Sequence, residues 1–283
     1  MNKDILEISR ETQNSHSKDT KTYKFVEKEW KKYIQSSNLK SLEHKKAKIN
    51  ISPIGEIILP YFKMGNIDSL DLFGLDEIYI FSIYWFNKKN YKNVADIGAN
   101  IGLHSIIMDK CGYKVDAYEP DPIHSKIFKK NIDLNNSKNV RIRKFAVSDK
   151  NKEEDFVRVV GNTTGSHLKG AKNSYGALET FKVKVKAINS IIRKYDLVKM
   201  DVEGEEAKII KSITDQKIFN NTDFICEISK EENKKIIFDH LKKFDVKIFS
   251  QKINWQIVKK ISDLPSSHRE GSIFISQNKI KVW

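Results

Sequence analysis

Residues 92–103, with the sequence KNVADIGANIGL, constrain the fold of this chain more than any other stretch. A short apolar run ends on Asp96, small residues follow, and a second apolar run begins at Leu103. This order predicts a strand, a tight turn and a helix, because Gly98 and Gly102 permit backbone conformations and close contacts that a side chain would block. Asp96 would then lie at the carboxyl end of a strand, where open α/β sheets bind their ligands.

The turn lacks the glycine pattern of a dinucleotide site. A pyrophosphate needs Gly-x-Gly-x-x-Gly before the helix N-terminus, but Asn100 occupies the second glycine position and the third glycine is absent. An acid followed by Gly-x-Asn-x-Gly suits a cofactor without phosphates, whose amino and carboxylate groups bind an acid and backbone N–H donors. The turn therefore disfavours NAD and favours S-adenosylmethionine. The alternative is an ordinary strand-to-helix turn with incidental glycines.

Composition indicates one α/β domain with an appendage. The 283 residues are 39% hydrophobic and 31% charged, which is typical of a chain that folds around a core. No apolar run approaches the length of a membrane span, and the N-terminus lacks the features of a signal peptide, so we expect a cytoplasmic protein. Cys111 and Cys226 are expected to be buried thiols rather than parts of a disulfide or zinc site.

The net charge of +14 raises the question of a nucleic-acid partner, because basic surfaces attract phosphate backbones. Arginine, whose guanidinium group is preferred for bidentate hydrogen bonds to phosphates and guanines, contributes little of this charge. Most of the charge comes from scattered lysines. The pattern favours a solvated basic surface, and nucleic acid is the disfavoured partner.

The N-terminal fifty residues are expected to form an appendage. Residues 1–21 are polar and predict a frayed or disordered tail. From Thr22 the apolar residues Phe25, Val26, Trp30, Tyr33 and Ile34 recur at helical spacing and predict an amphipathic helix. Residues 49–62 have the β-branched content and Pro/Gly punctuation of a hairpin, and a buried helix is expected over 76–87. Glu77 on that helix could reach the glycine turn, or could serve only as an acid at a helix N-terminus.

The remaining chain alternates strands and helices. After the first strand, further strands are expected at 114–119, 140–147, 197–201 and 224–228. Helices are expected at 103–111, 123–134, 187–194, 207–213 and 231–244. An inserted hairpin at 155–160 and 181–185 is expected around the polar loop 162–167, and a final antiparallel pair at 246–250 and 272–276. This spacing is that of repeated βαβ units and predicts a mainly parallel sheet.

Acids follow several of these strands. Glu119 ends the second strand, where a carboxylate can accept hydrogen bonds from both hydroxyls of a ribose. Asp201 and Glu203 leave the fourth strand, beside the edge that carries Asp96 and Glu119. Glu205 and Glu206 stand in the first turn of the next helix, where acids are ordinary dipole and capping features.

The motifs taken together resemble the FkbM family of S-adenosylmethionine-dependent methyltransferases. They are DIGANIG at 96–102, EPD at 119–121, AVSD at 146–149 and KMDVEG at 199–204, and the resemblance runs from about Gly55 to the C-terminus. It implies a class I methyltransferase fold, that is, a Rossmann-like, doubly wound seven-stranded sheet with a reversed last strand. It also implies O-methylation of sugars, glycolipids or secondary metabolites.

The resemblance also implies roles for individual residues. Asp96, Gly98, Asn100 and Gly102 would hold the methionine part of S-adenosylmethionine, and Glu119 its ribose. Phe145 stands where many class I methyltransferases carry an acid, so the adenine would rest on apolar atoms and backbone near Ala146. We therefore divide the chain into an appendage at 1–50, which would serve substrate choice or oligomerisation, and a methyltransferase domain at 51–283.

Catalysis requires a base, since a sugar hydroxyl is a poor nucleophile until its proton is removed. Asp201 and Glu203 are the candidates, one to hold cofactor or substrate and one to act as base, with simple helix capping as the alternative for Glu203. Asp201 and Glu227 could both face a divalent metal, but no third ligand is evident and no metal site is assigned. The acceptor, a small molecule or glycan, is expected to touch the inserted loop.

Two other functions remain open on the sequence alone. A nucleic-acid methyltransferase, for instance one acting on RNA, agrees with the charge but lacks an Asn-Pro-Pro-Tyr type motif after the fourth strand, where this chain has Asp-Val-Glu-Gly. The second open function is a non-catalytic scaffold role for a fold that binds the cofactor.

Overall fold

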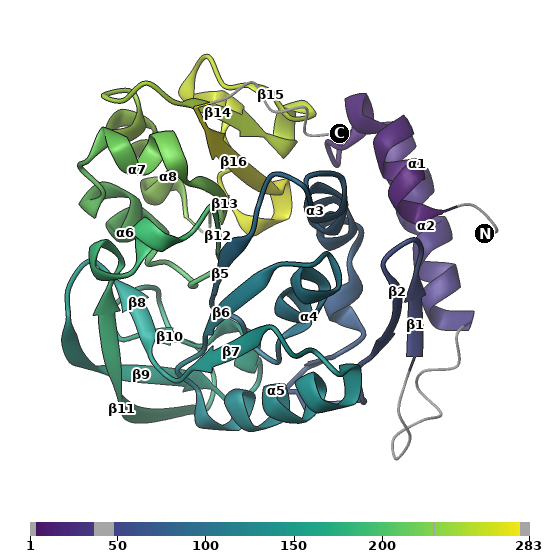
Figure 1. Cartoon of the computed structure of the whole chain (residues 1–283). Helices are drawn as coiled ribbons and strands as arrows, with labels where there is room; N and C mark the ends of the chain where they lie inside the picture. Colours follow the sequence, from purple (N-terminus) through teal and green to yellow (C-terminus); the bar gives the residue numbers. More distant parts are fainter. Residues whose placement is uncertain (1–3, 37–47, 229, 278–283) are drawn as a thin grey trace.

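The central element of the fold is an eight-stranded sheet in the order β15-β14-β16-β13-β12-β5-β6-β7 (Figure 1). The structure is a computed structural model that describes residues 4–36, 48–228 and 230–277. The strands of this sheet are β5 (Asn93–Ile97), β6 (Lys114–Tyr118), β7 (Val140–Arg143), β12 (Leu197–Met200), β13 (Asp223–Glu227), β14 (Lys247–Ser250), β15 (Gln256–Ile257) and β16 (Ser272–Ser276).

The directions of the strands confirm the predicted class I methyltransferase architecture. β5, β6, β7, β12 and β13 are parallel, whereas β16 is antiparallel to its neighbours β13 and β14. The sheet exceeds the expected seven strands because the short β15 pairs with the outer edge of β14. β5 lies between β6 and β12, so the acids that follow these strands gather at one edge of the sheet.

Helices cover both faces of the sheet (Figure 1). One face carries α3 (Leu75–Phe86), α4 (Leu103–Lys110) and α5 (Pro122–Asn135), and the other carries α6 (Glu206–Ser212), α7 (Gln216–Asn221) and α8 (Glu231–Leu241). All but α7 were predicted. That helix has six residues, of which only Ile218 and Phe219 are buried. Two buried positions are too few to show the hydrophobic periodicity of a helix in the sequence.

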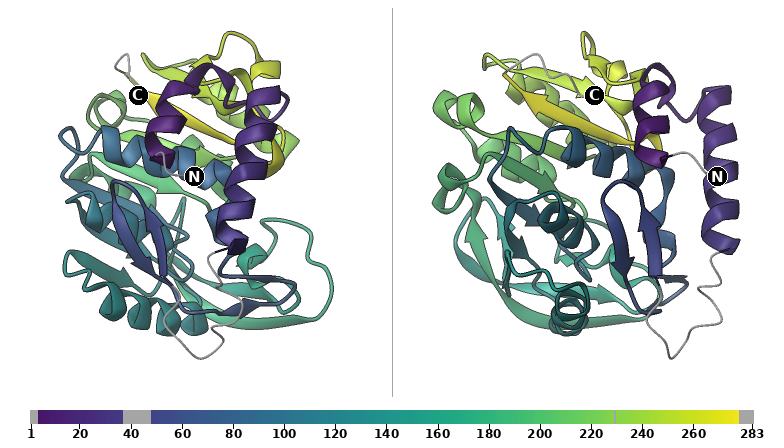
Figure 2. Two further views of the ribbon diagram at one scale, coloured as in Figure 1. Left: turned by 90° about the vertical axis from the view of Figure 1, so that its right-hand side faces the viewer. Right: turned by 45° about the vertical axis from the view of Figure 1, so that its right-hand side comes forward.

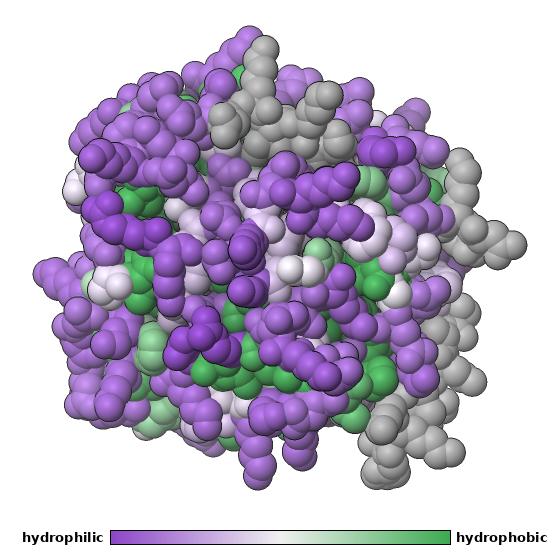
Figure 3. All heavy atoms as spheres, viewed as in Figure 1, coloured by the Kyte–Doolittle hydropathy of each residue, from purple (hydrophilic) through white to green (hydrophobic). Residues whose placement is uncertain are grey.

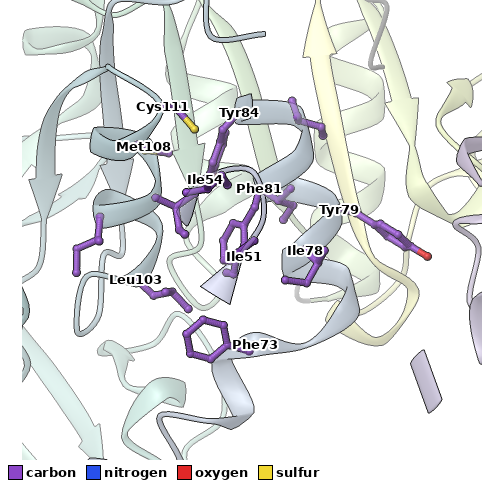
Figure 4. Close-up of a cluster of buried hydrophobic side chains, with 14 of the residues drawn as sticks. Ile51, Ile54, Phe73, Ile78, Tyr79, Phe81, Tyr84, Leu103, Met108 and Cys111 are labelled. Carbon is purple, nitrogen blue, oxygen red and sulfur yellow. The ribbon is translucent and has the colours of Figure 1, made fainter. Parts of the chain in front are cut away.

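The core on the α3 side also includes the N-terminal hairpin. In Figure 4, Ile51 and Ile54 of the hairpin lie beside Phe81 of α3 and face the side chains of α4, including Leu103 and Met108. The predicted hairpin is confirmed as β1 (Lys48–Ile51) paired with β2 (Gly55–Ile58). A further pair, β3 (Lys63–Met64) and β4 (Ile67–Asp68), follows it.

The N-terminal segment forms an outer layer, and the expectation of a frayed tail at 1–21 is wrong for its described residues. α1 (Ile5–Glu11) begins at Asp4, whose carboxylate accepts the N–H of Leu6 at 2.9 Å, and it packs on α3 (Figures 1 and 2). Leu6 is completely buried there. A helix this short shows no clear period, and its stability comes from α3, which a local pattern cannot reveal.

A buried histidine fixes the connection between α1 and α2 (Lys21–Ser36). The ring of His16 stacks on Tyr79 of α3 at 3.6 Å between centroids. Its Nδ1 accepts the indole N–H of Trp255 at 3.0 Å, and its Nε2 lies 2.8 Å from the carbonyl of Ser9. These contacts fix the neutral tautomer that carries its proton on Nε2.

The amphipathic helix predicted from Thr22 is confirmed as α2, although one apolar residue that was predicted to face the core is exposed to solvent. Trp30 is buried and donates its indole N–H to the carbonyl of Phe73 at 2.7 Å. Phe25, which the spacing put on the buried face, is 66% exposed. The apolar stripe of α2 is therefore narrower than the sequence indicates.

A second sheet, in the order β10-β9-β11-β8, projects beside the first. Its strands are β8 (Ala146–Ser148), β9 (Lys152–Val159), β10 (His167–Leu168) and β11 (Leu178–Ala187), so the predicted inserted hairpin is longer than expected. The single strand expected at 140–147 is wrong. Phe145 N–H bonds to the carbonyl of Arg143 at 2.9 Å, and this tight turn directs Ala146 out of the main sheet into pairing with β11. The helix expected at 187–194 is a pair of 3₁₀ turns, Ile188–Ser190 and Ile192–Lys194.

The surface and the cysteines agree with the composition. Hydrophilic residues cover most of the face in Figure 3, with hydrophobic residues visible between them. Cys111 and Cys226 are free and buried, as predicted. Within the described parts of the chain, no helix has the length and hydropathy needed to cross a bilayer.

Candidate active site

The turn after β5 is packed directly against the end of β12. Gly98 has φ +80°, and a Cβ on it would stand 1.8 Å from the carbonyl oxygen of Asp201. The N–H of Asp201 donates to the carbonyl of Ile97 at 3.0 Å, which extends the pairing of the two strands beyond their ends. Only glycine permits both the backbone conformation and this approach. Residues 98–100 and Asp201 are therefore held in fixed relation.

Glu119 is built into the same turn. One carboxylate oxygen accepts the N–H of Asn100 at 2.7 Å, and the other accepts the N–H of Asp121 at 2.8 Å. Burial raises the pKa of Glu119 to about 8, against the lowering effect of these two N–H donors. In the ionised form, each oxygen keeps a second lone pair for another donor.

A cavity of about 510 Å³ opens at this edge of the sheet, between the strand ends and the second sheet. Most of the predicted site residues line it, namely Glu77, Gly98, Asn100, Glu119, Ala146, Asp201 and Glu203. The structure thus brings together residues from five separate stretches of the sequence. A neighbouring hollow of about 210 Å³ shares Glu77, Asp201 and Glu227 with it.

Asp96 and Gly102 lie behind the cavity wall instead of in it. The Asp96 side chain is fully buried, and Ser105 donates to its Oδ2 at 2.6 Å. At Gly102 an added Cβ would stand 2.0 Å from the Phe128 ring, so this residue faces α5. Both residues shape the turn from behind, and direct contact of either one with a cofactor stays a prediction.

Carboxylates with different ionisation meet at the end of β12. Although burial opposes it, the Lys199 ammonium lowers the pKa of Asp201. Burial and then the charge of Asp201 raise the pKa of Glu203 to about 7, even though Glu203 pairs with Lys172. Burial and the same charge raise the pKa of Glu227 well above its ordinary value, so Glu227 donates the hydrogen bond that it shares with Asp201.

The backbone around Glu203 holds its side chain toward the cavity. Glu203 has φ +54°, in the left-handed region of backbone conformation that residues other than glycine rarely adopt. The carboxylate of Glu206 accepts the N–H of Val202 at 3.2 Å and the N–H of Gly204 at 3.1 Å, and it thereby stabilises this turn. Glu206 is therefore a structural residue, in keeping with the capping role expected for it.

Glu77 of α3 lines the cavity, which agrees with one of the two alternatives that the sequence left open for it. Its carboxylate pairs with His104 Nε2 at 2.9 Å, and His104 Nδ1 lies 3.0 Å from the hydroxyl of Tyr84. This chain of contacts connects α3 with the first turn of α4. Contact of Glu77 with a cofactor stays a prediction.

Sequence reasoning missed two lysines of the site. Lys199 is 6% exposed, and its Nζ lies 3.6 Å from Asp201 Oδ2 and 3.9 Å from Asp96 Oδ1. A signal for it existed, because a lysine between Val198 and Met200 interrupts an otherwise apolar central strand. Lys172 comes from the insertion, whose loop gives no comparable signal.

The lining of the cavity fits S-adenosylmethionine. Asn100 Oδ1 is buried and has no hydrogen-bond partner among the described residues, which leaves it ready for a donor of a ligand. Glu119 offers acceptors beside it. Apolar side chains of the second sheet, Val147, Phe156 and Leu168, also line the cavity and suit a flat adenine ring. As for a metal, no cluster of three or more His, Cys, Asp or Glu side chains able to bind one occurs in residues 4–36, 48–228 and 230–277.

Comparisons with known proteins match this chain to methyltransferases. A family model described as "Methyltransferase FkbM domain" matches residues 96–245. Methyltransferase sdnD of Sordaria araneosa is 27% identical over 164 residues, covering 44% of this chain and 61% of that protein.

Solved structures are similar at lower identity. Methyltransferase FkbM from Methylobacillus flagellatus KT is 15% identical, with a TM-score of 0.39 over 73% of this chain and 52% of that one. A SAM-dependent methyltransferase from Agrobacterium tumefaciens is 9% identical, with a TM-score of 0.42 over 82% of this chain and 70% of that one. The present chain therefore spans 61% of the length of the curated relative and 52% of the first of these structures.

Proposed function

The chain belongs to the FkbM methyltransferase family, and we propose that it transfers the methyl group of S-adenosylmethionine to a hydroxyl group of a small-molecule or glycan acceptor. The observation that carries this proposal is the cavity that joins Asn100, Glu119 and Glu203. It supports the proposal because hydrogen-bond acceptors suited to the cofactor and a carboxyl group suited to proton transfer line the same cavity.

Asn100 and Glu119 are proposed to bind the cofactor. The free Oδ1 of Asn100 and the remaining lone pairs of Glu119 accept its polar hydrogens, with the ribose hydroxyls assigned to Glu119. The Gly98 turn, which lines the cavity, is assigned the methionine part, and the apolar residues near Ala146 are assigned the adenine. When bound, S-adenosylmethionine supplies a methyl group already activated by its sulfonium centre.

Glu203 is proposed as the general base. Its pKa of about 7 places it close to the working pH, where a base combines adequate basicity with a large ionised fraction. Asp201 is the weaker base, because Lys199 lowers its pKa and holds it ionised. The two acids that the sequence left interchangeable thus receive separate roles: Asp201 provides negative charge, and Glu203 takes the proton of the acceptor hydroxyl.

The acceptor is proposed to bind against the loop between β9 and β10. Thr163, Thr164 and Ser166 place hydroxyl-bearing side chains on the cavity wall, together with Lys172 and Tyr175. Such a lining offers hydrogen bonds to a ligand rich in hydroxyl groups, which supports a sugar or glycan over an apolar metabolite. The turn between β3 and β4 contacts the start of this loop, because the N–H of Asn66 donates to the carbonyl of Gly161 at 2.7 Å.

Incubation with S-adenosylmethionine labelled in its methyl group, followed by mass spectrometry, tests this function. The panel contains sugars, glycolipids, secondary metabolites and RNA, with the Glu203→Gln variant as the control for background methylation. We expect label on a hydroxyl oxygen of a small molecule or glycan. Labelled RNA would contradict the acceptor class. Absence of cofactor binding in calorimetry at millimolar concentration would contradict the enzyme itself and favour a scaffold.

A further inference from the structure

Lys199 is a buried cation at the centre of the sheet. It lies on β12, in register with Asp96 of the neighbouring strand β5 and Ile225 of β13. Burial of an ammonium group without partners is strongly unfavourable, and a central parallel strand normally carries apolar side chains. The cost of keeping a lysine here indicates that its charge is needed.

The Lys199 ammonium connects two acids that follow different strands. Nζ lies 3.9 Å from Asp96 Oδ1 and 3.6 Å from Asp201 Oδ2. Asp96 is completely buried and bound through its other oxygen to Ser105 of α4, so it cannot turn toward the cavity. Asp201 is different, because its side chain is 36% exposed and lines the cavity.

Other charged groups surround this pair. Besides Asp96 and Asp201, those facing Lys199 or Asp201 are Glu77 of α3, His104 of α4, Lys172 of the insertion, Glu203 after β12, Glu227 of β13 and His268 before β16. Together with Asp96 and Asp201, five of these eight groups are carboxyl groups. Without a buried cation, carboxyl groups packed this closely take up protons in place of remaining charged.

We propose that Lys199 is the positioning residue of the site, whose buried ammonium keeps Asp201 as a carboxylate that faces the cavity and receives the cationic part of the cofactor. This inference rests on the proposed use of S-adenosylmethionine, which carries an ammonium and a sulfonium. Lys199 lines the neighbouring hollow and is not among the residues that line the cavity assigned to the cofactor. It acts through Asp201, while Asp96 serves as its fixed counter-ion.

The first experiment needs no cofactor. Titration of the side-chain carboxyl of Asp201 by NMR is compared between the wild-type chain and Lys199→Met, which removes the charge at nearly constant volume. The midpoint for Asp201 should move upward by about four pH units in the variant, because the effect of burial is then no longer opposed by the Lys199 ammonium. The control variant is Lys211→Met, which makes the same substitution at an exposed position of α6 and should leave the Asp201 midpoint unchanged. An unmoved midpoint in Lys199→Met would overturn the proposal.

The second experiment measures cofactor binding by calorimetry at pH 6.5, 7.5 and 9. The dissociation constant of Lys199→Met, divided by that of the wild type, should be about 30 to 100 at pH 6.5 and fall to about 3 at pH 9, where Asp201 ionises again. A ratio that is the same at every pH would indicate a merely structural role and overturn the inference. Lys199→Arg, which keeps the charge, should bind within about fivefold of wild type at every pH.

Should Lys199→Met fold poorly, the double variant Lys199→Met/Asp96→Asn restores the charge balance of the buried pair and is measured in its place. Its Asp201 titration should still be displaced upward, because the cation is missing. Wild-type protein that binds no S-adenosylmethionine would contradict the proposed function and the cofactor role of Asp201. The NMR titration would then decide separately whether Lys199 controls the charge of Asp201.

Discussion

A Cβ on Gly98 would stand 1.8 Å from the carbonyl oxygen of Asp201, so the turn after β5 and the end of β12 touch through their backbones. Neither backbone can move freely, because each strand is paired within the sheet. The positions of Asn100 and Asp201 in the cavity therefore depend on one another. A side chain at position 98 would separate the two strand ends on which the site is built.

We expect Gly98→Ala to abolish measurable cofactor binding and to lower the melting temperature. The φ of +80° alone costs about 1–2 kcal/mol for a residue with a Cβ, and the contact with Asp201 adds to it. Gly112→Ala is the matched control, because Gly112 has φ +95° but no described atom within 4 Å of an added Cβ. Calorimetry and thermal unfolding of both variants separate the two effects. Equal losses in both would show that the close approach at Gly98 is unimportant.

Glu119 should make cofactor binding depend on pH. Ribose hydroxyls donate to a carboxylate, so a Glu119 whose pKa is about 8 must lose its proton when the cofactor binds. The affinity should therefore rise with pH, by at most about tenfold per pH unit, and level off above pH 8.

Glu119→Ala tests the same assignment. Loss of two charge-assisted hydrogen bonds should weaken binding of S-adenosylmethionine and of its demethylated product by about tenfold to a few hundredfold above pH 8. The variant should also lose the rise with pH. Affinity within twofold of wild type, with an unchanged melting temperature, would show that Glu119 is not the ribose anchor.

The βαβ core was predictable because its signals are local. An apolar run that ends on an acid, followed by glycines, marks a strand and the turn after it, and strands of this type place their carboxyl ends at one edge. Asp96, Glu119 and Asp201 could thus be assigned to one region from the sequence alone. Which of them faces the cavity could not, because side-chain direction at a strand end depends on packing such as the Asp96–Ser105 contact.

The parts that escaped prediction depend on contacts distant in sequence. α1 is stabilised by α3, and His16 is buried because Tyr79 and Trp255 receive it. The break before Ala146 depends on pairing with β11, which lies about forty residues further along the chain. Lys199 shows a different limit: its presence in an apolar strand was visible, but its partners were not.

His16 should make the fold sensitive to acid. Burial lowers its pKa from 6.5 to about 3, so between these values the unfolded chain binds a proton that the folded chain does not. Stability is then fully present above pH 6.5 and falls as the pH decreases, by at most about 1.4 kcal/mol per pH unit. Urea unfolding from pH 4 to 7 measures this slope.

His16→Phe supplies the comparison for that slope. The variant keeps the stacking on Tyr79 but leaves the indole N–H of Trp255 without its acceptor, so it should be less stable at pH 7. Its stability should nevertheless depend less on pH below 6.5 than that of the wild type, because the titrating group is gone. An identical slope in both proteins would assign the acid sensitivity to other groups.

Glu203→Gln should separate catalysis from cofactor binding. The amide keeps the size of the side chain but cannot take a proton, and general-base assistance is typically worth about 10²–10⁴ in rate. Turnover should fall by that factor while the affinity for S-adenosylmethionine stays within about threefold, since Glu203 is assigned to the acceptor side. Wild-type turnover should increase with pH through about 7, where Glu203 loses its proton, and the residual activity of the variant should lack this increase. Glu232→Gln, at an exposed position on α8, controls for the substitution itself. Unchanged turnover in Glu203→Gln would remove Glu203 from the mechanism and leave helix capping, the alternative that the sequence left open, as its only proposed role.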